Sequence, residues 1–300
     1  MTFCRSIILL FAVLTPAWSF ASEQFQRVRM VVIVSIDGGR PDLLRSNDLP
    51  TIQRLIREGA WSMNGSTVMP SRTLPSHVSM LTSVRPSTHG ITWNEWRPER
   101  GAVSIPTIFS RAKSAGFGTV LLAAKEKFRH LDIAGSLDAF TYSERTSEQM
   151  AGIAVKELEK RNSGLVFVHL PDVDVAGHLY GWGSREQFGA LKSTDRALAR
   201  ILQKVDTMIA KDVAITLIIT GDHGGTGKDH GSERPTDSRI PWIAYGRNVQ
   251  KGPLFSPIQT IDTSSTAAWL LGVEPAKEWE GKPIKAAFCE DSCFEIPLVN

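Results

Sequence analysis

The chain has 300 residues, of which 42% are hydrophobic and 22% are charged. This composition is ordinary for a soluble globular protein built around one substantial domain. The formal net charge is +3 and no run of like charges occurs, which argues against a nucleic-acid duplex as a partner, because duplex binding needs a clustered basic face.

Residues 1–21 have the pattern of a secretory signal peptide. Arg5 precedes an apolar run, and the small residues Ser19 and Ala21 stand where a signal peptidase prefers them. A buried N-terminal helix is the alternative. The run is shorter than the roughly 20 apolar residues of a transmembrane helix, and no later segment is apolar enough to be one. We expect a secreted or periplasmic protein with one domain over residues 22–300.

Along the rest of the chain, buried strands alternate with helices. The predicted strands are apolar runs rich in β-branched residues, at 30–36, 118–123, 164–170, 213–220 and 239–245. The predicted helices have apolar residues at helical spacing, at 50–59, 74–81, 105–115, 148–161, 185–210 and 263–271. This alternation predicts an α/β fold, a three-layer sandwich with a mostly parallel central sheet and helices on both faces.

Polar side chains follow three of these strands. Asp37 follows the first, Asp174 and His178 lie just after the third, and Asp222 and His223 follow the fourth. Because sheets of this kind bind ligands beyond the carboxyl ends of their strands, we expect these side chains to lie together. One helical turn would place Asp174 and His178 on the same side; a solvated loop pair is the alternative.

A histidine in a later loop completes a set of three carboxylates and three imidazoles. Such side chains bind zinc and similar divalent ions, manganese and iron included. The set would fill two metal sites and leave positions open, and two ions about 4 Å apart can clamp the entering and leaving oxygens of a phosphoryl transfer. We therefore predict two divalent metal ions, held by Asp37, Asp174, His178, Asp222, His223 and His230.

Thr73, in the segment MPSRTLPSH, stands at the start of a predicted helix. A hydroxyl at this position faces free N–H groups and the positive end of the helix dipole. Coordination to a metal would lower its pKa and make it a nucleophile. The alternative is that Thr73 only caps the helix.

Taken together, these motifs resemble the type I phosphodiesterase/nucleotide pyrophosphatase family of the alkaline phosphatase superfamily. The segments SIDGGRPD, PSRTLPSH, RPSTHGI, PDVDVAGHLYG, TGDHGG and DHG occur in the family's order. The resemblance implies an alkaline-phosphatase-like fold and a hydrolase of small phosphorylated substrates, with a phospho-threonine intermediate. It also implies one zinc on Asp174, His178 and His230, and another on Asp37, Asp222, His223 and Thr73.

Further residues bear on the substrate. Asn94, in ITWNEW, falls where the family has an asparagine that donates to a phosphoryl oxygen; a turn asparagine is the alternative. Ser76 stands where the family often has Asn. Lys125 and Lys127, in AAKEKF, resemble paired basic residues of superfamily members that bind terminal phosphoryl groups; a solvated helix start is the alternative.

The lysine pair leaves the reaction open. A phosphodiesterase follows from the family, while the lysines favour a phosphomonoesterase or phosphonate hydrolase. A phospho-headgroup transferase would use the same metals. A sulfatase is disfavoured, because its nucleophile arises from Cys or Ser, which Thr73 cannot replace.

Two cysteines, Cys289 and Cys293, remain after removal of the signal peptide. Because an exported compartment permits disulfides, we predict a bridge between them. The natural substrate and the oligomeric state do not follow from the sequence.

Overall fold

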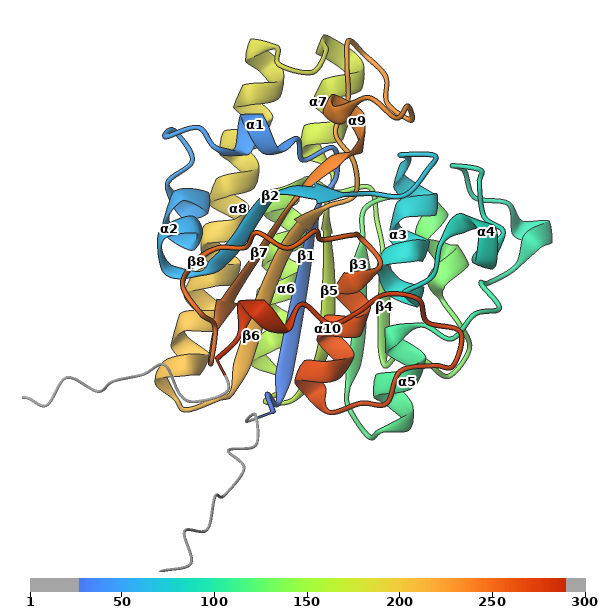
Figure 1. The fold of residues 1–300 in the computed structure, drawn as a ribbon, viewed down its shortest axis with the longest axis vertical. Coiled ribbons are helices and arrows are strands. Elements are labelled where there is room, and N and C mark those ends of the chain that lie inside the picture. Colours follow the sequence, from blue (N-terminus) through green and yellow to red (C-terminus); the bar gives the residue numbers. More distant parts are fainter. Residues whose placement is uncertain (1–26, 290–300) are drawn as a thin grey trace, which may run out of the picture.

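Strand β1 (Met30–Ile36) lies at the centre of an eight-stranded sheet in the computed structural model, which describes residues 27–289 (Figure 1). The strand order is β4-β3-β5-β1-β6-β7-β2-β8. β1 pairs in parallel with β5 (Gly164–Leu170) and β6 (Ile215–Gly221), whereas β7 (Arg239–Gly246) is antiparallel to both its neighbours. The other strands are β2 (Ala60–Ser66), β3 (Thr119–Ala123), β4 (Ala139–Tyr142) and β8 (Gly252–Pro253).

Helices cover both faces of the sheet, which is the middle of three layers (Figure 1). One face packs against α3 (Thr73–Thr82), α5 (Ile108–Ser114) and α10 (Asp262–Leu271). The other face packs against α2 (Pro50–Glu58), α6 (Ser147–Glu159) and α8 (Arg185–Ala210). The predicted fold class, a three-layer sandwich with a mostly parallel sheet, is confirmed.

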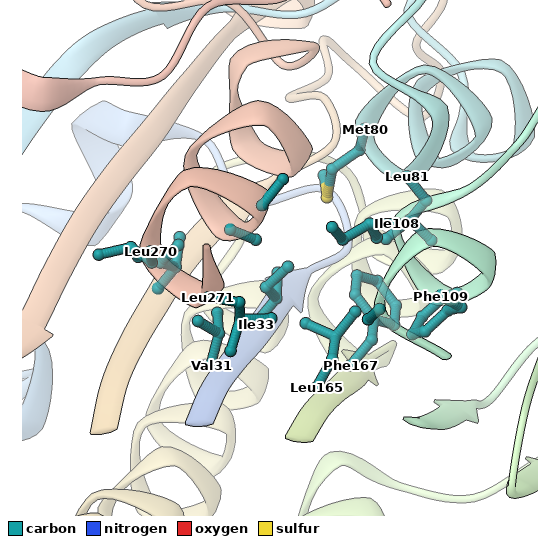
Figure 2. Packing of buried hydrophobic residues seen from close by; sticks show 14 of the residues in the cluster. Val31, Ile33, Met80, Leu81, Ile108, Phe109, Leu165, Phe167, Leu270 and Leu271 are labelled. Atoms are coloured by element: carbon teal, nitrogen blue, oxygen red, sulfur yellow. The ribbon is translucent and has the colours of Figure 1, made fainter. Parts of the chain in front are cut away.

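The residues of β1 show why its sequence is almost continuously apolar. Val31 and Ile33 pack in the cluster formed with α3, α5 and α10 (Figure 2), while Val32 and Val34 pack in the cluster on the opposite face. Successive side chains of a strand point to opposite faces, so a strand that is covered on both sides needs apolar residues at nearly every position. All seven residues of β1 are buried.

Short helices connect these elements, mostly near the edges of the sheet. They are α1 (Pro41–Leu44), α4 (Pro86–His89), η1 (Pro98–Arg100), η2 (Glu126–Leu131), α7 (Asp172–Tyr180), α9 (Pro235–Ser238) and η3 (Lys285–Ala287). Of these, α7 follows directly on β5 and carries two of the predicted metal ligands.

Two predictions concern the ends of the chain. The predicted signal peptide, residues 1–21, lies outside the described residues. Cys289 is disulfide-bonded, but Cys293 lies outside the described residues, so the pairing of these two cysteines stays a prediction. Between residues 27 and 289, every helix is too short or too polar to cross a membrane.

Candidate metal centre

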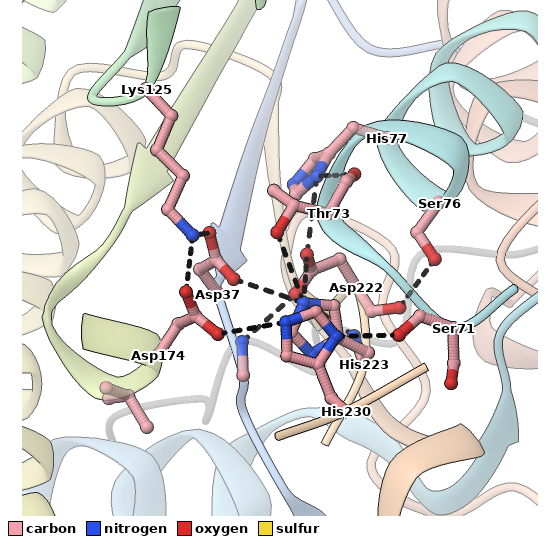
Figure 3. Close-up of polar contacts among 12 residues, drawn as sticks. Asp37, Ser71, Thr73, Ser76, His77, Lys125, Asp174, Asp222, His223 and His230 are labelled. Atoms are coloured by element: carbon pink, nitrogen blue, oxygen red, sulfur yellow. Dashed lines mark hydrogen bonds and ion pairs between the residues drawn. The ribbon is translucent and has the colours of Figure 1, made fainter. Parts of the chain in front are cut away.

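The structure brings all six predicted ligands together at the carboxyl edge of the sheet, and Figure 3 labels all of them except His178. Asp37 follows β1, Asp222 and His223 follow β6, and α7, which carries Asp174, follows β5. Parallel neighbours end at the same edge, so residues far apart in the sequence meet there. The side chain of His178 is 42% exposed; the other five ligands are Asp37, Asp174, Asp222, His223 and His230, and all are buried.

In each of the three carboxylates, one oxygen accepts hydrogen bonds from other residues or contacts a lysine. Asp222 Oδ1 accepts hydrogen bonds from the backbone N–H groups of Gly38 and His223, at 3.1 and 3.0 Å. Asp37 Oδ2 accepts from His169 Nε2 at 2.7 Å, and Lys125 contacts the outer oxygens of Asp37 and Asp174. The second oxygen of each carboxylate is buried without a hydrogen-bond partner among the described residues: Asp37 Oδ1, Asp174 Oδ1 and Asp222 Oδ2. A buried charged oxygen without a partner is costly, which indicates a bound cation.

The three histidines share one tautomer. In each, Nδ1 lies within hydrogen-bond distance of a backbone carbonyl oxygen, which can only accept, so Nδ1 carries a proton and, in the neutral imidazole, Nε2 keeps the lone pair. The carbonyls belong to Gly224, Ser71 and Lys228, at 2.8, 2.9 and 2.9 Å, for His223, His230 and His178 respectively. This is the usual arrangement of histidine ligands, whose second nitrogen is held by an acceptor.

The histidine Nε2 atoms and the carboxylate oxygens without a hydrogen-bond partner lie close together. His223 Nε2 lies 3.4 Å from Asp37 Oδ1 and 3.2 Å from Asp222 Oδ2. His178 Nε2 and His230 Nε2 lie 3.4 and 3.6 Å from Asp174 Oδ1. Two ligands at about 2.0–2.1 Å from a tetrahedral zinc ion are separated by roughly 3.3 Å. The six residues therefore fit two divalent cations in donor type, protonation and spacing.

The grouping of ligands differs slightly from the one expected. The atoms of Asp37, Asp222 and His223 lie within 4.8 Å of one another, as predicted for one site. The second compact group contains Asp174, His230 and also His223. The rings of His223 and His230 stack, with centroids 3.7 Å apart, so His223 stands between the two groups while His178 closes the outer side.

Burial and charge repulsion shift the pKa values of the acidic and histidine side chains in the site. Burial, and next the negative charge of Asp37, raise the pKa of Asp222 well above its usual value. Burial and the neighbouring His230 lower the pKa of His223 to about 4, so this imidazole is neutral at pH 7. Burial also raises the pKa of Asp37, but Lys125 and His169 outweigh it and hold that pKa well below its usual value. A cation at the bare oxygens would relieve the repulsion between Asp37 and Asp222.

Thr73 is the first residue of α3, and Arg72 holds the N-cap position. No side chain caps the helix there, so the capping alternative does not describe Thr73. Instead, its hydroxyl lies 3.3 Å from His223 Nε2. Asn94 lies beside the N-terminal end of α3, where its Oδ1 accepts a hydrogen bond from the backbone N–H of Leu74 at 2.9 Å.

Two residues that support this site were not predicted to do so. His169 lies within β5, and its Nε2 donates to Asp37. The backbone N–H of Ala124 donates to its Nδ1 at 3.3 Å, which leaves the ring proton on Nε2. A histidine in an otherwise apolar buried strand was the only sequence signal. Trp182 is the second such residue.

Trp182 packs beneath the ligand-bearing loops. Its Nε1 donates to the carbonyl of Gly38 at 3.3 Å. A Cβ atom on Gly177 or Gly225 would lie 2.8 or 2.3 Å from the indole, so glycine is needed at both positions for the ring to approach. One side chain thus contacts the loops that follow β1 and β6, and helix α7.

The two lysines are placed differently. Lys125 Nζ lies 2.5 Å from Asp37 Oδ2 and 2.5 Å from Asp174 Oδ2 (Figure 3). Burial lowers its pKa, but these two carboxylates outweigh burial and raise it. Lys127 makes no ion pair or hydrogen bond with any residue between 27 and 289. Burial, and then the charge of Lys125, lower the pKa of Lys127 to about 8.

A three-layer sandwich with acidic and histidine ligands at the carboxyl edge, beside a hydroxyl at a helix N-terminus, defines the alkaline-phosphatase-like class of hydrolase. The sequence profile of the family "Type I phosphodiesterase / nucleotide pyrophosphatase" matches residues 31–234. The chain belongs to this family of phosphoric ester hydrolases, which confirms the resemblance of its motifs.

Curated relatives are about a quarter identical to this chain over the aligned residues. The mouse protein bis(5'-adenosyl)-triphosphatase enpp4 is 26% identical over 214 residues, which are 65% of this chain and 46% of the mouse protein. GPI ethanolamine phosphate transferase 1 of Saccharomyces cerevisiae is 26% identical over 247 residues, which are 74% of this chain and 26% of the yeast protein. The chain therefore spans half or less of the length of these relatives.

Solved structures show the same fold. Murine ectonucleotide pyrophosphatase/phosphodiesterase 5 has a TM-score of 0.72 at 14% identity, with 88% of this chain and 100% of that chain covered. An inactive variant of that murine protein, in complex with AMP, has a TM-score of 0.73. The 2-O GAG sulfatase BT1596 has a TM-score of 0.67 at 14% identity, with 87% and 74% covered.

Proposed function

We propose that the chain is a two-metal phosphoric ester hydrolase in which Thr73 is the nucleophile. The observation that carries this proposal is the convergence of three histidine Nε2 atoms and three carboxylate oxygens that have no hydrogen-bond partner among the described residues, with His223 Nε2 3.3 Å from the Thr73 hydroxyl. When bound, two divalent cations would lower the pKa of that hydroxyl and offset the charge of the phosphoryl oxygens. Family membership supports phosphoryl chemistry.

The ligands divide between two cations, and a mixture of nitrogen and oxygen donors supports zinc. One cation would be held by Asp37, Asp222 and His223, and the other by Asp174, His178 and His230. Thr73 Oγ1 lies on the side of the first group, through its contact with His223.

The reaction would proceed through a phospho-threonine. Thr73 Oγ1 gives its proton to water and forms a bond to phosphorus while the bond between phosphorus and the leaving oxygen breaks, and the leaving group takes a proton from water. A water molecule then attacks phosphorus, the bond to Oγ1 breaks, and the threonine hydroxyl is restored. Attack by the same hydroxyl in every turnover requires a fixed position, which the first turn of α3 supplies.

Asn94 would stabilise the transition state. Because its Oδ1 is occupied by the N–H of Leu74, the side-chain amide group is oriented with its two N–H donors away from the helix. These donors have no hydrogen-bond partner among the described residues. A fixed donor that meets a phosphoryl oxygen as its charge develops lowers the barrier more than it tightens substrate binding.

The test of the nucleophile compares Thr73→Ala with Thr73→Ser. The alanine variant should bind both metals, measured by elemental mass spectrometry, and hydrolyse bis-p-nitrophenyl phosphate at a background rate. The serine variant keeps the hydroxyl and should retain measurable turnover. Wild-type turnover by Thr73→Ala would exclude Thr73 as the nucleophile, and metal-free wild-type protein with full activity would exclude the two-metal centre.

A phosphomonoesterase or phosphonate hydrolase is the second candidate, favoured by the lysine pair. A terminal phosphoryl group carries one more charged oxygen than a diester, and Lys127 is a half-buried lysine with no ion pair among the described residues. On this hypothesis Lys127→Met should slow p-nitrophenyl phosphate hydrolysis far more than bis-p-nitrophenyl phosphate hydrolysis. Equal losses on both substrates would remove the argument for a monoester site.

Transfer to an alcohol is the third possibility, because the yeast relative is named as an ethanolamine phosphate transferase and the mouse relative as a triphosphatase. Both reactions can share the first step and differ only in whether water or an alcohol accepts the phosphoryl group. Product analysis with and without an added alcohol distinguishes the two reactions.

Export is a further proposal, and N-terminal sequencing of the protein recovered outside the cytoplasm should give Ser22 as its first residue.

A further inference from the structure

Lys125 joins the two groups of metal ligands. Its ammonium lies 2.5 Å from Asp37 Oδ2 and 2.5 Å from Asp174 Oδ2, so it contacts one carboxylate from each group (Figure 3). Lys125 follows shortly after β3, which is separated from β1 by β5 in the sheet. The side chain therefore reaches over the end of β5 to bind two carboxylates, one in the loop after β1 and one in helix α7.

The ammonium and the cations would use different oxygens. Lys125 contacts the Oδ2 atoms of Asp37 and Asp174, whereas the Oδ1 atoms of both residues have no hydrogen-bond partner among the described residues. The Oδ1 atoms are also the ones that face the histidine Nε2 atoms. Lys125 can thus keep both contacts when cations are bound, and its side chain is only 18% exposed.

The charges of the site make this contact important. Three carboxylates lie buried together, and the Nδ1 atoms of the histidines that face them lie within hydrogen-bond distance of backbone carbonyl oxygens. Within residues 27–289, Lys125 is the one lysine or arginine whose charged group contacts any of these carboxylates. Removing one member of a buried ion pair leaves the other charge uncompensated, which is strongly destabilising.

We propose that Lys125 is a positioning residue, the permanent counter-ion of Asp37 and Asp174, which keeps the two ligand groups together without metal and weakens their attraction for cations. This inference rests on the metal centre of the proposed function. It assigns Lys125 a role other than the substrate binding expected from the sequence, because both of its short contacts are to the ligands themselves.

The proposal predicts how loss of the Lys125 ammonium changes two quantities, the stability of the metal-free protein and its affinity for metal. Without the ammonium, the metal-free site has three buried carboxylates and no cation in contact with them, so the metal-free protein should lose stability. The same change removes a positive charge that repels incoming cations, so metal should bind more tightly. A lysine that only bound substrate would leave both quantities unchanged and raise KM.

The experiment compares Lys125→Met with Lys127→Met, a matched control two residues away that removes a lysine without an ion pair among the described residues. Thermal unfolding is measured in chelator and in excess Zn²⁺, and the metal Kd is measured by competition with a chromogenic chelator. For Lys125→Met we expect a Tm lower by about 5–10 °C in chelator, a smaller loss in Zn²⁺, and a Kd tighter by about tenfold or more. Lys127→Met, whose ammonium acts on these carboxylates only at longer range, should change the Kd by less than about threefold.

Two results would overturn the proposal. An unchanged Kd and unchanged metal-free Tm with a raised KM would make Lys125 a substrate ligand. A Kd weakened tenfold would make it an orienting group whose charge is secondary. If Lys125→Met does not fold, Lys125→Arg keeps the charge and should keep the Kd within about threefold of the wild type; tenfold tighter binding by Lys125→Arg would refute the role of charge.

The same measurements distinguish failure of this proposal from failure of the two-metal hypothesis. Absence of Zn²⁺ binding by the wild-type protein would refute the two-metal hydrolase, and the unfolding temperatures in chelator would still report on Lys125 as a counter-ion. Two equivalents of Zn²⁺ in the wild type, with no difference between the lysine variants, would refute only the role of Lys125.

Discussion

Replacement of His169 by leucine tests how strongly a residue outside the ligand set controls the metal centre. His169 Nε2 donates a 2.7 Å hydrogen bond to Asp37 Oδ2, and both side chains are fully buried. Leucine has a similar volume and can pack against Phe128, whose ring centroid lies 4.7 Å from that of His169. The substitution therefore removes the hydrogen bond with little change in packing.

Loss of such a partner typically weakens metal binding by about 10–100-fold, which corresponds to about 1.4–2.7 kcal/mol. We expect the lower half of this range, because Lys125 still contacts the same Asp37 oxygen. Competition with a chelator measures the Kd. His130→Leu is the control, since His130 is buried and hydrogen-bonded to the carbonyl of Gly101 rather than to a predicted ligand. A His169→Leu Kd within twofold of the wild type would refute the reasoning.

Three further predictions concern the residues around the centre. Asn94→Ala should lower kcat by about 10²–10³-fold with unchanged metal content, as for other transition-state donors; a change confined to KM would contradict this role. Lys127 has a pKa of about 8, so its charge is present below that pH and lost above it; hydrolysis of p-nitrophenyl phosphate should fall through pH 8, and Lys127→Met should abolish this dependence. Gly225→Ala, which places a Cβ 2.3 Å from the Trp182 ring, should destabilise the protein by about 1–3 kcal/mol in urea unfolding; an unchanged midpoint would contradict the packing.

The buried strands could be predicted closely from the sequence. The predicted bounds of 30–36, 164–170 and 185–210 agree with β1, β5 and α8 residue for residue, because burial on both sheet faces, or along a long helical stripe, requires a clear apolar pattern. β2 and β4 were not predicted. The residues of β4 are only partly buried and β2 alternates between buried and partly exposed positions, so neither has the continuous apolar run of a central strand.

The clustering of the six candidate ligands could be predicted because it depends on local motifs at strand ends. The supporting contacts could not. That Lys125 reaches Asp37, and that His169 supports it, depends on β3, β5 and β1 lying side by side in that order, and the sequence does not specify lateral strand order. The position of His223 between both ligand groups likewise depends on how two loops approach each other.

The two sides of α7 differ in how freely they can vary. Its inner side carries Asp174 and presents Gly177 to the indole of Trp182, where even one methyl group has no room. Its outer side exposes Val175, Leu179 and Tyr180 to solvent. Libraries that aim to change substrate choice can therefore randomise these three outer positions, within two residues of a ligand on the same helix, and leave the centre intact.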